Sequence, residues 1–542
     1  MMLAQNKIAG VSRILSTALR NNMSIPRMVE RLEDIIAGVY KPKGGNWSRR
    51  ELDVAFLIKA YGGPRLLYAM QKADAYPSHS TLRTRKKIPE LLVSTRQPTL
   101  MDMNSNISAF LGKEGRQPSP YAKLIGQCLM IDGVALEEVC RYDSNQHAVL
   151  GLCREHSTRD DSIVLTMDDI NRIHDRLFKT PNNPCHHAKD GTVAAIAPVT
   201  GEKHYYPVPV LLSGSCKTEN AAALQNWISQ FLHAYRHNPD GEAIHGPIYT
   251  LPTDGESTFR KVRLGLCLSE DLDRNSEMGK IIYSLPGMNC RTGPGGIIGT
   301  SDPKHTMKRM ATAIRSPKGI QLGDINITST FVLESLIKLP NMTSDKAASL
   351  LNPADKQNVP KAVNLLESLI DLGNLNFHRE TPADFYKLKR TAFLGRIFSF
   401  FLLPFVNVQM SLSSQIHSLS TYAHLLTALY YKHRTAFISS ALYIDTQSIV
   451  KNIILTTARL QGQDKTFKYF ILHEGTDRLE NLFSYARTHD HACNFDILQL
   501  SLKLGIAAEC CAIYERHPDL DHGHIRRNLV GARGIDHVNP RS

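Results

Sequence analysis

The periodicity of apolar residues changes along this chain, and the change restricts the folds that the chain can adopt. Strand-like apolar runs lie at Leu124–Ile131, Leu136–Tyr142, Ala148–Cys153, Thr192–Pro198, Tyr205–Ser213 and His245–Leu251. A helical segment with Leu224, Trp227 and Phe231 precedes the last of these runs. From about residue 325 to residue 470, the apolar spacing is almost entirely helical. This order predicts an α/β fold with a mixed sheet, interrupted by a large all-helical insertion.

The stretch His473–Arg487 predicts one more helix beyond the insertion. Thr476 stands at its N-cap position, and the apolar stripe that follows has the spacing i, i+3, i+4 and i+7. The stripe consists of Leu479, Leu482, Phe483 and Ala486. Glu480 flanks this stripe, and a carboxylate drawn into the interior must be neutral, paired or bound to a metal. This segment alone favours the alternative of a solvated Glu480 on an ordinary amphipathic helix, because charged residues are seldom fully buried.

Three carboxylates are distinguished by their positions. Asp132 follows an apolar strand and precedes Gly133, Asp254 follows another and precedes Gly255, and Glu480 lies on the helix beyond the insertion. Strand ends in an α/β layer place side chains at the rim of the sheet, where ligands collect. Three carboxylates brought together there would repel one another. A bound Mg²⁺ or Mn²⁺ ion usually compensates this repulsion, because both ions bind carboxylate oxygens. Each Asp-Gly pair alone is also a common turn, so only the combined order predicts a metal site.

The positive charge is concentrated in the N-terminal part of the chain. Residues 1–120 hold 19 Lys and Arg against 9 Asp and Glu, which is +10 of the chain's +13. Helical segments on both sides of Gly62-Gly63-Pro64 precede a short basic helix that Ser78 or Ser80 can cap. The basic residues of this helix are Arg83, Arg85, Lys86 and Lys87. We expect a helix-turn-helix-like region that binds DNA; the alternative is a helical bundle with a solvated basic face.

The cysteines and the apolar runs indicate a reduced intracellular protein without a membrane span. The 10 cysteines are scattered, and no pair has the Cys-x-x-Cys spacing. Cys185-His186-His187 invites a zinc interpretation, but neighbouring residues do not converge on one tetrahedral ion without further partners. The longest mostly apolar run, Ile397–Val408, is well short of the roughly 20 residues that cross a bilayer.

Five segments together resemble one known family. They are Met130-Ile-Asp-Gly133, Thr253-Asp-Gly-Glu-Ser-Thr258, Ser301-Asp-Pro-Lys-His-Thr-Met-Lys308, Asp355-Lys-Gln-Asn-Val-Pro-Lys-Ala362 and Thr476-Asp-Arg-Leu-Glu-Asn-Leu-Phe-Ser-Tyr-Ala-Arg487. Their residues, order and spacing resemble the P element and THAP-domain DNA transposases, which have an RNase H-like core interrupted by a helical insertion. The Asp-Pro-x-His and Asp-x-x-Glu-Asn-x-Phe-Ser motifs are the most distinctive of the five. The chain departs from the family in having no Cys before Cys128, so a THAP zinc domain is not recognisable.

The resemblance implies roles for individual residues. It implies that Asp132, Asp254 and Glu480 form the metal-binding catalytic triad of a DNA transposase. It places Asp302, His305 and Lys308 beside that site, whereas their spacing alone indicates only an Asp-Pro turn that caps a helix. Some relatives bind GTP through the insertion, which implies Asp477 and Lys356 as nucleotide contacts. The sequence has no P-loop that would support GTP binding independently.

We therefore predict a DNA transposase that cleaves and joins transposon-end DNA by two-metal phosphoryl transfer. The expected partners are transposon-end and target DNA and a second copy of the chain, with a nuclear location. The alternatives are a domesticated or truncated transposase that binds DNA without catalysis and, less strongly, a helical GTP-binding protein. The expected regions are a basic helical region 1–95, a linker 96–122, the first part of the core 123–325, the insertion 326–470, the last part of the core 471–515 and a tail 516–542.

Overall fold

The chain divides into two compact units. Residues 1–88, 487–493 and 516–518 form the first, and residues 89–486, 494–515 and 519–542 form the second. The computed structural model describes residues 16, 24, 26, 28–29, 33, 47–74, 76–113, 115–118, 121–179, 185–199, 206–355, 357–375, 381–407, 409–488 and 494–521.

The first unit contains the predicted helices of the basic region. Helix α3 (Arg49–Asp74) breaks at Gly63, whose φ of 74° favours glycine, and Pro64 opens its second half. Helix α4 (His79–Arg85) begins after Ser78, whose hydroxyl accepts a hydrogen bond from the Thr81 amide. The two helices share a small apolar core of Ala55, Leu67 and Leu82. The predicted glycine turn and the Ser78 cap are confirmed.

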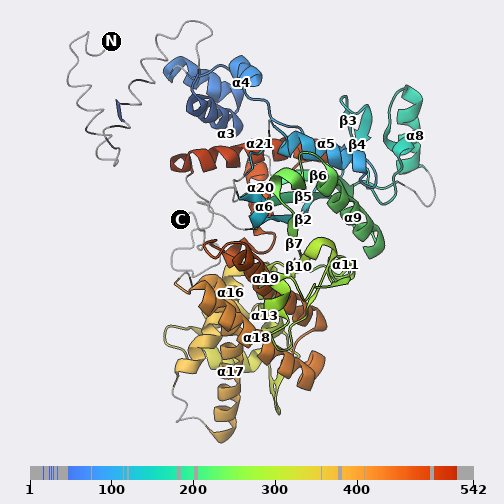
Figure 1. Cartoon of the computed structure of the whole chain (residues 1–542). Helices are drawn as coiled ribbons and strands as arrows, with labels where there is room; N and C mark the ends of the chain where they lie inside the picture. The colour runs from blue at the N-terminus through green and yellow to red at the C-terminus, as the bar shows by residue number, and fades with distance from the viewer. Residues whose placement is uncertain are drawn as a thin grey trace. The chain divides into compact units, whose positions relative to one another are not determined.

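The second unit is built around a six-stranded mixed sheet (Figure 1). In spatial order its strands are β1 (Val93–Ser94), β6 (Val208–Ser215), β5 (Asp190–Pro198), β2 (Gln127–Ala135), β7 (Ile248–Thr253) and β10 (Ile298–Ser301). Every neighbouring pair is parallel except the two that involve β5, which runs antiparallel to both β2 and β6. The predicted mixed α/β sheet is confirmed.

Helices cover the sheet because its central strands carry apolar side chains on both faces. Every residue of β6 is buried, as is all of β5 except Asp190. The covering helices are α5 (Leu100–Leu111), α9 (Ala221–His237), α11 (Ser257–Cys267), α20 (Asp477–Thr488) and α21 (Ile497–Arg516). By length and composition α21 could cross a membrane, but more than half of it is buried inside the protein.

Helix α5 lies in the segment 96–122 that was expected to be a polar linker. Thr99 and Asp102 form a capping box at its start. Its buried face carries Met103, Ile107 and Phe110, which have helical spacing within an otherwise polar stretch. The linker prediction differs from the structure because three well-spaced apolar residues are enough to dock a short helix against β6 and α9.

A hairpin of β11 (Ile320–Leu322) with β12 (Ile325–Ile327) leads into the insertion, and the regular elements among the insertion's other described residues are helices. Its helices are α14 (Ser329–Leu336), α15 (Ser344–Leu351), α16 (Val359–Asp371), α17 (Pro382–Val406), α18 (Leu412–His433) and α19 (Ser440–Gln463). The predicted helical character of residues 326–470 is confirmed for the described residues of this range. One apolar core continues from the sheet into these helices, so the insertion packs as part of the second unit.

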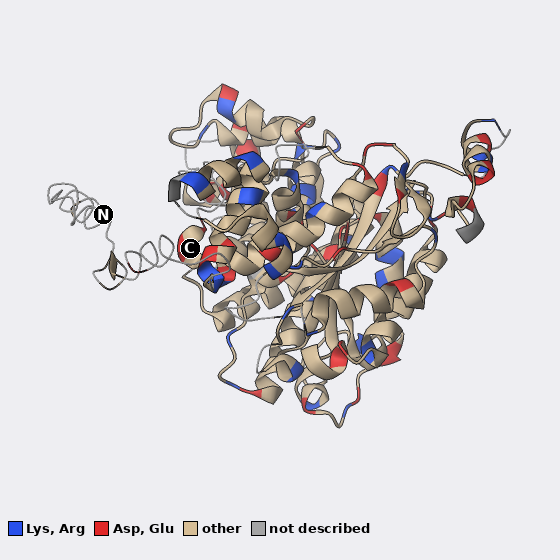
Figure 2. Cartoon of the chain, turned by 90° about the horizontal axis from the view of Figure 1, so that it is seen from above, with Lys and Arg blue, Asp and Glu red and all other residues tan. Residues whose placement is uncertain are grey.

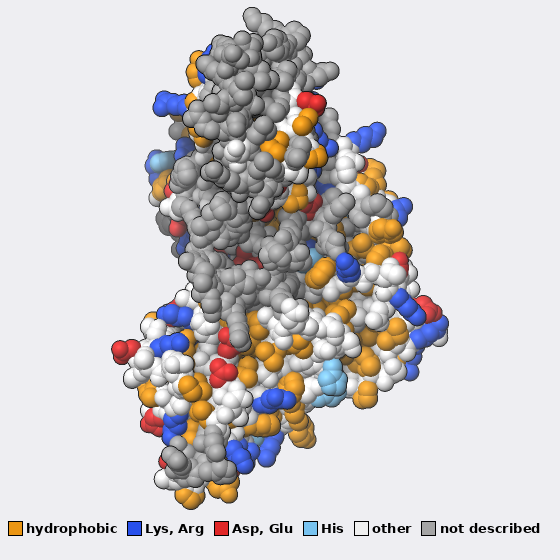
Figure 3. Space-filling model, turned by 90° about the vertical axis from the view of Figure 1, so that its left-hand side faces the viewer, with side chains coloured by type: hydrophobic (Ala, Val, Ile, Leu, Met, Phe, Trp, Pro, Cys, Tyr) orange, Lys and Arg blue, Asp and Glu red, His pale blue; other side chains and the backbone are white. Residues whose placement is uncertain are grey.

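Helix α13 (Pro303–Arg315) packs in the main core through Met307, Met310 and Ile314. The remaining elements are short connections and surface pieces: α6 (Ala122–Ile125), β3 (Arg141–Asp143), β4 (Ala148–Leu150), α7 (Arg159–Ser162), α8 (Met167–Phe178), α10 (Glu242–His245), β8 (Glu270–Asp271), α12 (Glu277–Ile282), β9 (Arg291–Thr292), η1 (Pro294–Gly296), η2 (Leu372–Asn374), η3 (Arg434–Ala436), η4 (Ile471–His473) and η6 (Pro518–Leu520). Basic and acidic positions are interspersed along the ribbon in Figure 2. The surface of the insertion helices in Figure 3 mixes both charges with scattered apolar side chains. This mixture agrees with the small share of the net charge that residues 121–542 carry.

Candidate functional site

Asp132 and Asp254 lie next to each other where two parallel strands separate. Ile131 on β2 is opposite Thr253 on β7, and an aspartate follows each of them. Because neighbouring strands are about 4.8 Å apart, the two side chains start from adjacent backbone positions. Strand β7 ends at Thr253, whereas β2 continues beyond Asp132 to Ala135, so Asp132 is not at a strand end as its sequence context suggested.

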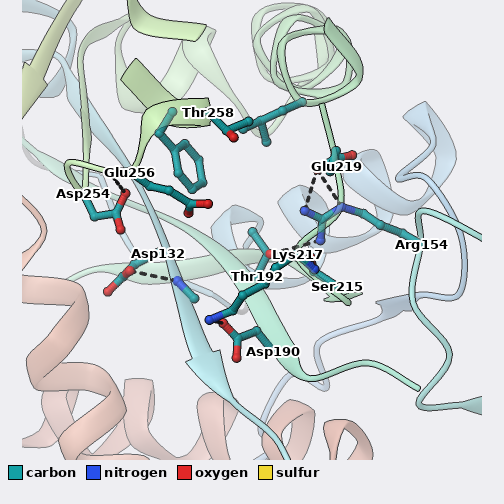
Figure 4. Close-up of a pocket in the computed structure, with 13 residues that line it drawn as sticks. Asp132, Arg154, Asp190, Thr192, Ser215, Lys217, Glu219, Asp254, Glu256 and Thr258 are labelled. Atoms are coloured by element: carbon teal, nitrogen blue, oxygen red, sulfur yellow. Dashed lines mark hydrogen bonds and ion pairs between the residues drawn. The ribbon is translucent and has the colours of Figure 1, made fainter. Parts of the chain in front are cut away.

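These two aspartates open into a small cavity of about 140 Å³. Figure 4 shows the carboxylates of Asp132 and Asp254 on the same side of the group, whereas the Glu256 side chain extends towards the middle of the view. The cavity also has two basic side chains, and each is paired elsewhere on its wall. Lys217 Nζ lies 2.5 Å from an oxygen of Asp190, and Arg154 Nη2 lies 2.7 Å from an oxygen of Glu219.

Glu480 lies on α20, the helix predicted beyond the insertion, and is not among the residues that line this cavity; its charge nevertheless acts on Asp132 and raises the pKa of that carboxyl. The predicted stripe of Leu479, Leu482, Phe483 and Ala486 is buried, which confirms the face on which this helix packs. The Glu480 side chain is 38% exposed, and its Oε1 lies 3.2 Å from Nε2 of His305 on α13. Burial raises the pKa of Glu480, but His305, Lys304 and Lys308 outweigh it and lower the pKa. Glu480 therefore carries its charge beside a histidine.

The three predicted carboxylates share one electrostatic environment. Burial is the main cause that raises the pKa of Asp132 to about 7, and the charges of Glu480 and Asp254 raise it further. The Gly133 amide, 2.8 Å from Asp132 Oδ1, and the charge of His305 oppose this rise. A divalent cation that binds carboxylate oxygens would compensate the repulsion among these three groups and favour the ionised form of Asp132. The donors present therefore fit Mg²⁺ or Mn²⁺.

Asp302 joins the two helices that carry His305 and Glu480. It is 1% exposed, and its Oδ1 accepts the His305 amide at 3.0 Å as the N-cap of α13. Its Oδ2 accepts the Thr476 amide at 2.9 Å, at the start of α20. One carboxylate thus caps two helix N-termini, where negative charge is favoured. Asp302 positions the site, and the Asp-Pro turn also caps a helix, as its spacing indicated.

We expect Gly475→Ala to lower the unfolding free energy by about 1–3 kcal/mol, because it disturbs the junction between α13 and α20. Gly475 has a φ of 90°, and a Cβ there would lie 2.4 Å from Asp302 Oδ2. Urea unfolding measures the effect. Gly373→Ala is the matched control, because a Cβ at Gly373 meets nothing within 4 Å. Equal unfolding free energies for the two variants would contradict this role of Gly475.

The remaining residues predicted near the site have other partners. Lys304 forms an ion pair with Asp477, the residue implied as a guanine contact. The Lys308 ammonium donates to Gln357 Oε1 at 3.2 Å. Lys356 lies outside the described residues. GTP binding therefore stays a prediction, to be tested by nucleotide titration.

The four basic residues of the first unit do not behave alike. Arg83, Arg85 and Lys87 are exposed. Lys86 instead forms an ion pair with the buried Asp53, which is also held by Arg516 at 2.9 Å. Burial raises the pKa of Asp53, but Arg516 and Lys86 outweigh it and lower the pKa. Lys86 therefore stabilises the unit, and three basic side chains remain open to solvent.

Asp445 was missed by the sequence analysis. It lies on α19 of the insertion, is 0% exposed, and forms ion pairs with three arginines of the core, Arg260, Arg263 and Arg309. Arg260 Nη2 also donates to the Gly255 carbonyl at 2.6 Å, and Arg309 donates to the same oxygen. Gly255 follows Asp254, so the insertion fixes the loop that carries a candidate metal ligand. A single Asp on a helix gives no signal of this in the sequence.

Glu474 is a second buried carboxyl that the sequence analysis did not identify. It is 6% exposed and accepts hydrogen bonds from the Tyr469 hydroxyl and the Asn452 amide. Burial raises its pKa to about 7, from an ordinary value of 4.5. The folded state therefore binds this proton more tightly than the unfolded state does. This contribution to stability is complete below about pH 4.5 and is lost as the pH rises towards 7.

Glu474→Gln removes this titration. We expect the unfolding free energy of the variant, relative to the unmodified chain, to rise by about 3 kcal/mol between pH 4.5 and pH 8. Urea unfolding at several pH values measures the difference, in which all other titrating groups cancel. A difference that does not depend on pH would contradict the raised pKa of Glu474.

Comparisons with known proteins give one similar solved structure. No protein-family model matches the chain. No curated protein matches it either. The similar structure is a Drosophila P element transposase strand transfer complex, with 14% sequence identity and a TM-score of 0.49. The comparison covers 93% of this chain and 99% of that chain.

Proposed function

We propose that this chain is a DNA transposase that cleaves transposon-end DNA and joins it to target DNA by metal-dependent phosphoryl transfer. The observation that carries the proposal is the position of Asp132 and Asp254 on adjacent parallel strands, with Glu480 on α20 near enough for its charge to raise the pKa of Asp132. The five motifs that resemble P element and THAP-domain transposases supply these residues in the same order. The strand order, with β5 as the one antiparallel strand of the sheet, supports an RNase H-like core.

The three carboxylates would hold Mg²⁺ or Mn²⁺ by their oxygens. When bound, such ions activate a water or a 3′-hydroxyl and stabilise the leaving oxygen of an in-line displacement. Asp132 and Asp254 supply ligands from adjacent strands of a rigid sheet, so their spacing is fixed before DNA binds. His305 orients the Glu480 carboxylate, and Asp302 holds the helices that carry both.

The assay is Mg²⁺- or Mn²⁺-dependent nicking and joining of terminal-repeat DNA by the purified chain. Hydrolysis or joining that needs one of these ions supports the proposal. The rival function is a domesticated protein that binds the same DNA and leaves it intact. DNA binding without nicking under any divalent ion would establish that rival. Because transposition joins two ends, we also propose at least a dimer on DNA. A nuclear location is part of the same proposal.

We further propose that Arg83 and Arg85 of α4, together with the exposed Lys87 beyond its end, bind DNA phosphates. Affinity should then fall steeply with salt, and Arg83→Ala or Arg85→Ala should each reduce the log–log salt slope by about 1. Fluorescence anisotropy at several salt concentrations measures the slope. Arg172→Ala, which removes an exposed arginine of α8 that is paired with Asp169, is the control and should leave the slope unchanged. A flat salt response of the unmodified chain would contradict phosphate binding.

A further inference from the structure

Four metal-ligating side chains meet on the second unit, outside the carboxylate site. They are Cys153, His156, His186 and Cys216, and their ligand atoms all lie within 4.8 Å of one another. His156 Nδ1 is 3.2 Å from the sulfur of Cys153 and 3.4 Å from the sulfur of Cys216. The rings of His156 and His186 have centroids 4.1 Å apart. Both cysteines are buried free thiols.

Three separate segments bring these side chains together, and backbone hydrogen bonds fix the segments. Cys153 and His156 follow β4, His186 precedes β5, and Cys216 follows β6. The Cys153 amide donates to the His186 carbonyl at 2.9 Å, and the Arg154 amide donates to the Gly214 carbonyl at 2.9 Å. The ligand positions are therefore set by the sheet and by its connections.

The donor set selects the metal. Two thiolates and two imidazoles suit the borderline-soft, tetrahedral zinc ion, whereas Mg²⁺ and Mn²⁺ prefer oxygen. Zinc–sulfur bonds of about 2.3 Å and zinc–nitrogen bonds of about 2.0 Å place tetrahedral ligand atoms roughly 3.3–3.8 Å apart. The two distances to His156 Nδ1 agree with this geometry. We propose that Cys153, His156, His186 and Cys216 bind a structural zinc ion that joins these three segments.

Groups around Cys216 complete the site. The Thr218 hydroxyl lies 3.0 Å from the Cys216 sulfur, so it can donate to the thiolate. Glu155 accepts the Cys216 amide at 3.1 Å and the Ser215 hydroxyl at 2.5 Å. Such outer partners orient metal ligands. The backbone then turns sharply at Lys217, which has a φ of 66°.

The zinc site lies directly behind one wall of the carboxylate cavity. Arg154 follows the ligand Cys153, and Lys217 follows the ligand Cys216. Both of these basic side chains line the cavity that contains Asp132 and Asp254 (Figure 4). The zinc ion would thus hold the backbone from which the basic wall of the candidate active site projects. It would not take part in the phosphoryl transfer.

The test is the zinc content of the purified full chain, measured by mass spectrometry after dialysis into metal-free buffer with a reductant. We expect about one zinc ion per chain, and Co²⁺ in its place should show tetrahedral ligand-field bands with thiolate charge transfer. Cys216→Ser and His186→Ala should lose the metal. Cys290→Ser and His187→Ala are the matched controls and should retain it, because neither residue belongs to the group of four.

A chain without zinc under these conditions, or one that keeps its zinc in Cys153→Ser and Cys216→Ser, would overturn the proposal. A Cys153–Cys216 disulfide is the competing outcome, and thiol counting on the denatured chain without reductant detects it. If the ligand variants do not fold, the zinc content and the cobalt spectrum of the unmodified chain still decide. Thermal unfolding adds a further readout, because a chelator should lower the Tm of the unmodified chain.

Discussion

Asp132→Asn is expected to lower Mg²⁺-dependent DNA cleavage by at least about 10³-fold, because it removes the ligand at the centre of the three carboxylates. Glu480→Gln should have an effect of similar size, since Glu480 is the third proposed metal ligand and its charge already acts on Asp132. Both substitutions preserve side-chain shape, so binding of the same DNA should be retained. Nicking of a plasmid that carries the terminal repeats measures cleavage, and anisotropy measures binding.

Asp271→Asn is the control for these two variants. Its carboxylate is 80% exposed on β8 and is not part of the cavity, so cleavage should stay at the level of the unmodified chain. If the Asp132 variant cleaves DNA at a rate within about tenfold of the unmodified chain, Asp132 is not an essential metal ligand of the reaction. The same outcome for Glu480→Gln would leave α20 with a packing role only.

Asp445→Asn is expected to destabilise the second unit by about 3–5 kcal/mol, which is a large part of the stability of a typical domain. The charge of Asp445 faces three arginines, two of which have side chains no more than 13% exposed. Without that charge, buried guanidinium groups remain uncompensated. Burial raises the pKa of Asp445, but these arginines outweigh it and lower the pKa, so its ionised form is the one that stabilises. Urea unfolding measures the loss.

Asp324→Asn is the matched control for Asp445→Asn. Asp324 is 83% exposed and lies 3.5 Å from Arg390, so its loss should change the unfolding free energy by less than about 1 kcal/mol. Cleavage should also fall in the Asp445 variant, because Arg260 and Arg309 hold the Gly255 carbonyl beside Asp254. Equal stability of the two variants would show that the insertion does not depend on this buried charge.

Local patterns were sufficient for the elements that carry the site. The strand-like runs before Asp132 and Asp254 predicted the two strands, and the stripe from Leu479 to Ala486 predicted the helix. Each pattern was recognisable because it follows the period of its own element. Helix α5 was missed because Met103, Ile107 and Phe110, although helically spaced, lie in a stretch that is otherwise polar and contains Gly and Pro. The helical character of the insertion followed from the same periodicity, but the bounds of its individual helices were not predicted.

Contacts between distant segments could not be predicted in this way. Asp302 caps a helix that begins 175 residues later in the chain, and Asp445 pairs with arginines more than 130 residues away. The Cys153-x-x-His156 spacing is a local signal for the proposed zinc site that the sequence analysis did not use, and the other two proposed ligands come from separate segments. A sequence pattern contains local spacing, whereas these sites depend on which segments the sheet brings together.

The most direct test is Fe²⁺-mediated cleavage of the protein itself, with ascorbate as reductant and hydrogen peroxide as oxidant. Fe²⁺ can replace Mg²⁺ at oxygen ligands, and its reaction with the peroxide releases hydroxyl radicals that cut the nearby backbone. It requires no knowledge of the DNA substrate. If Asp132, Asp254 and Glu480 form one metal site, fragments should end near all three residues, excess Mg²⁺ should suppress the cuts, and Asp132→Asn should abolish them. Cuts near one of the three residues only, or cuts unaffected by Mg²⁺, would contradict a shared metal site.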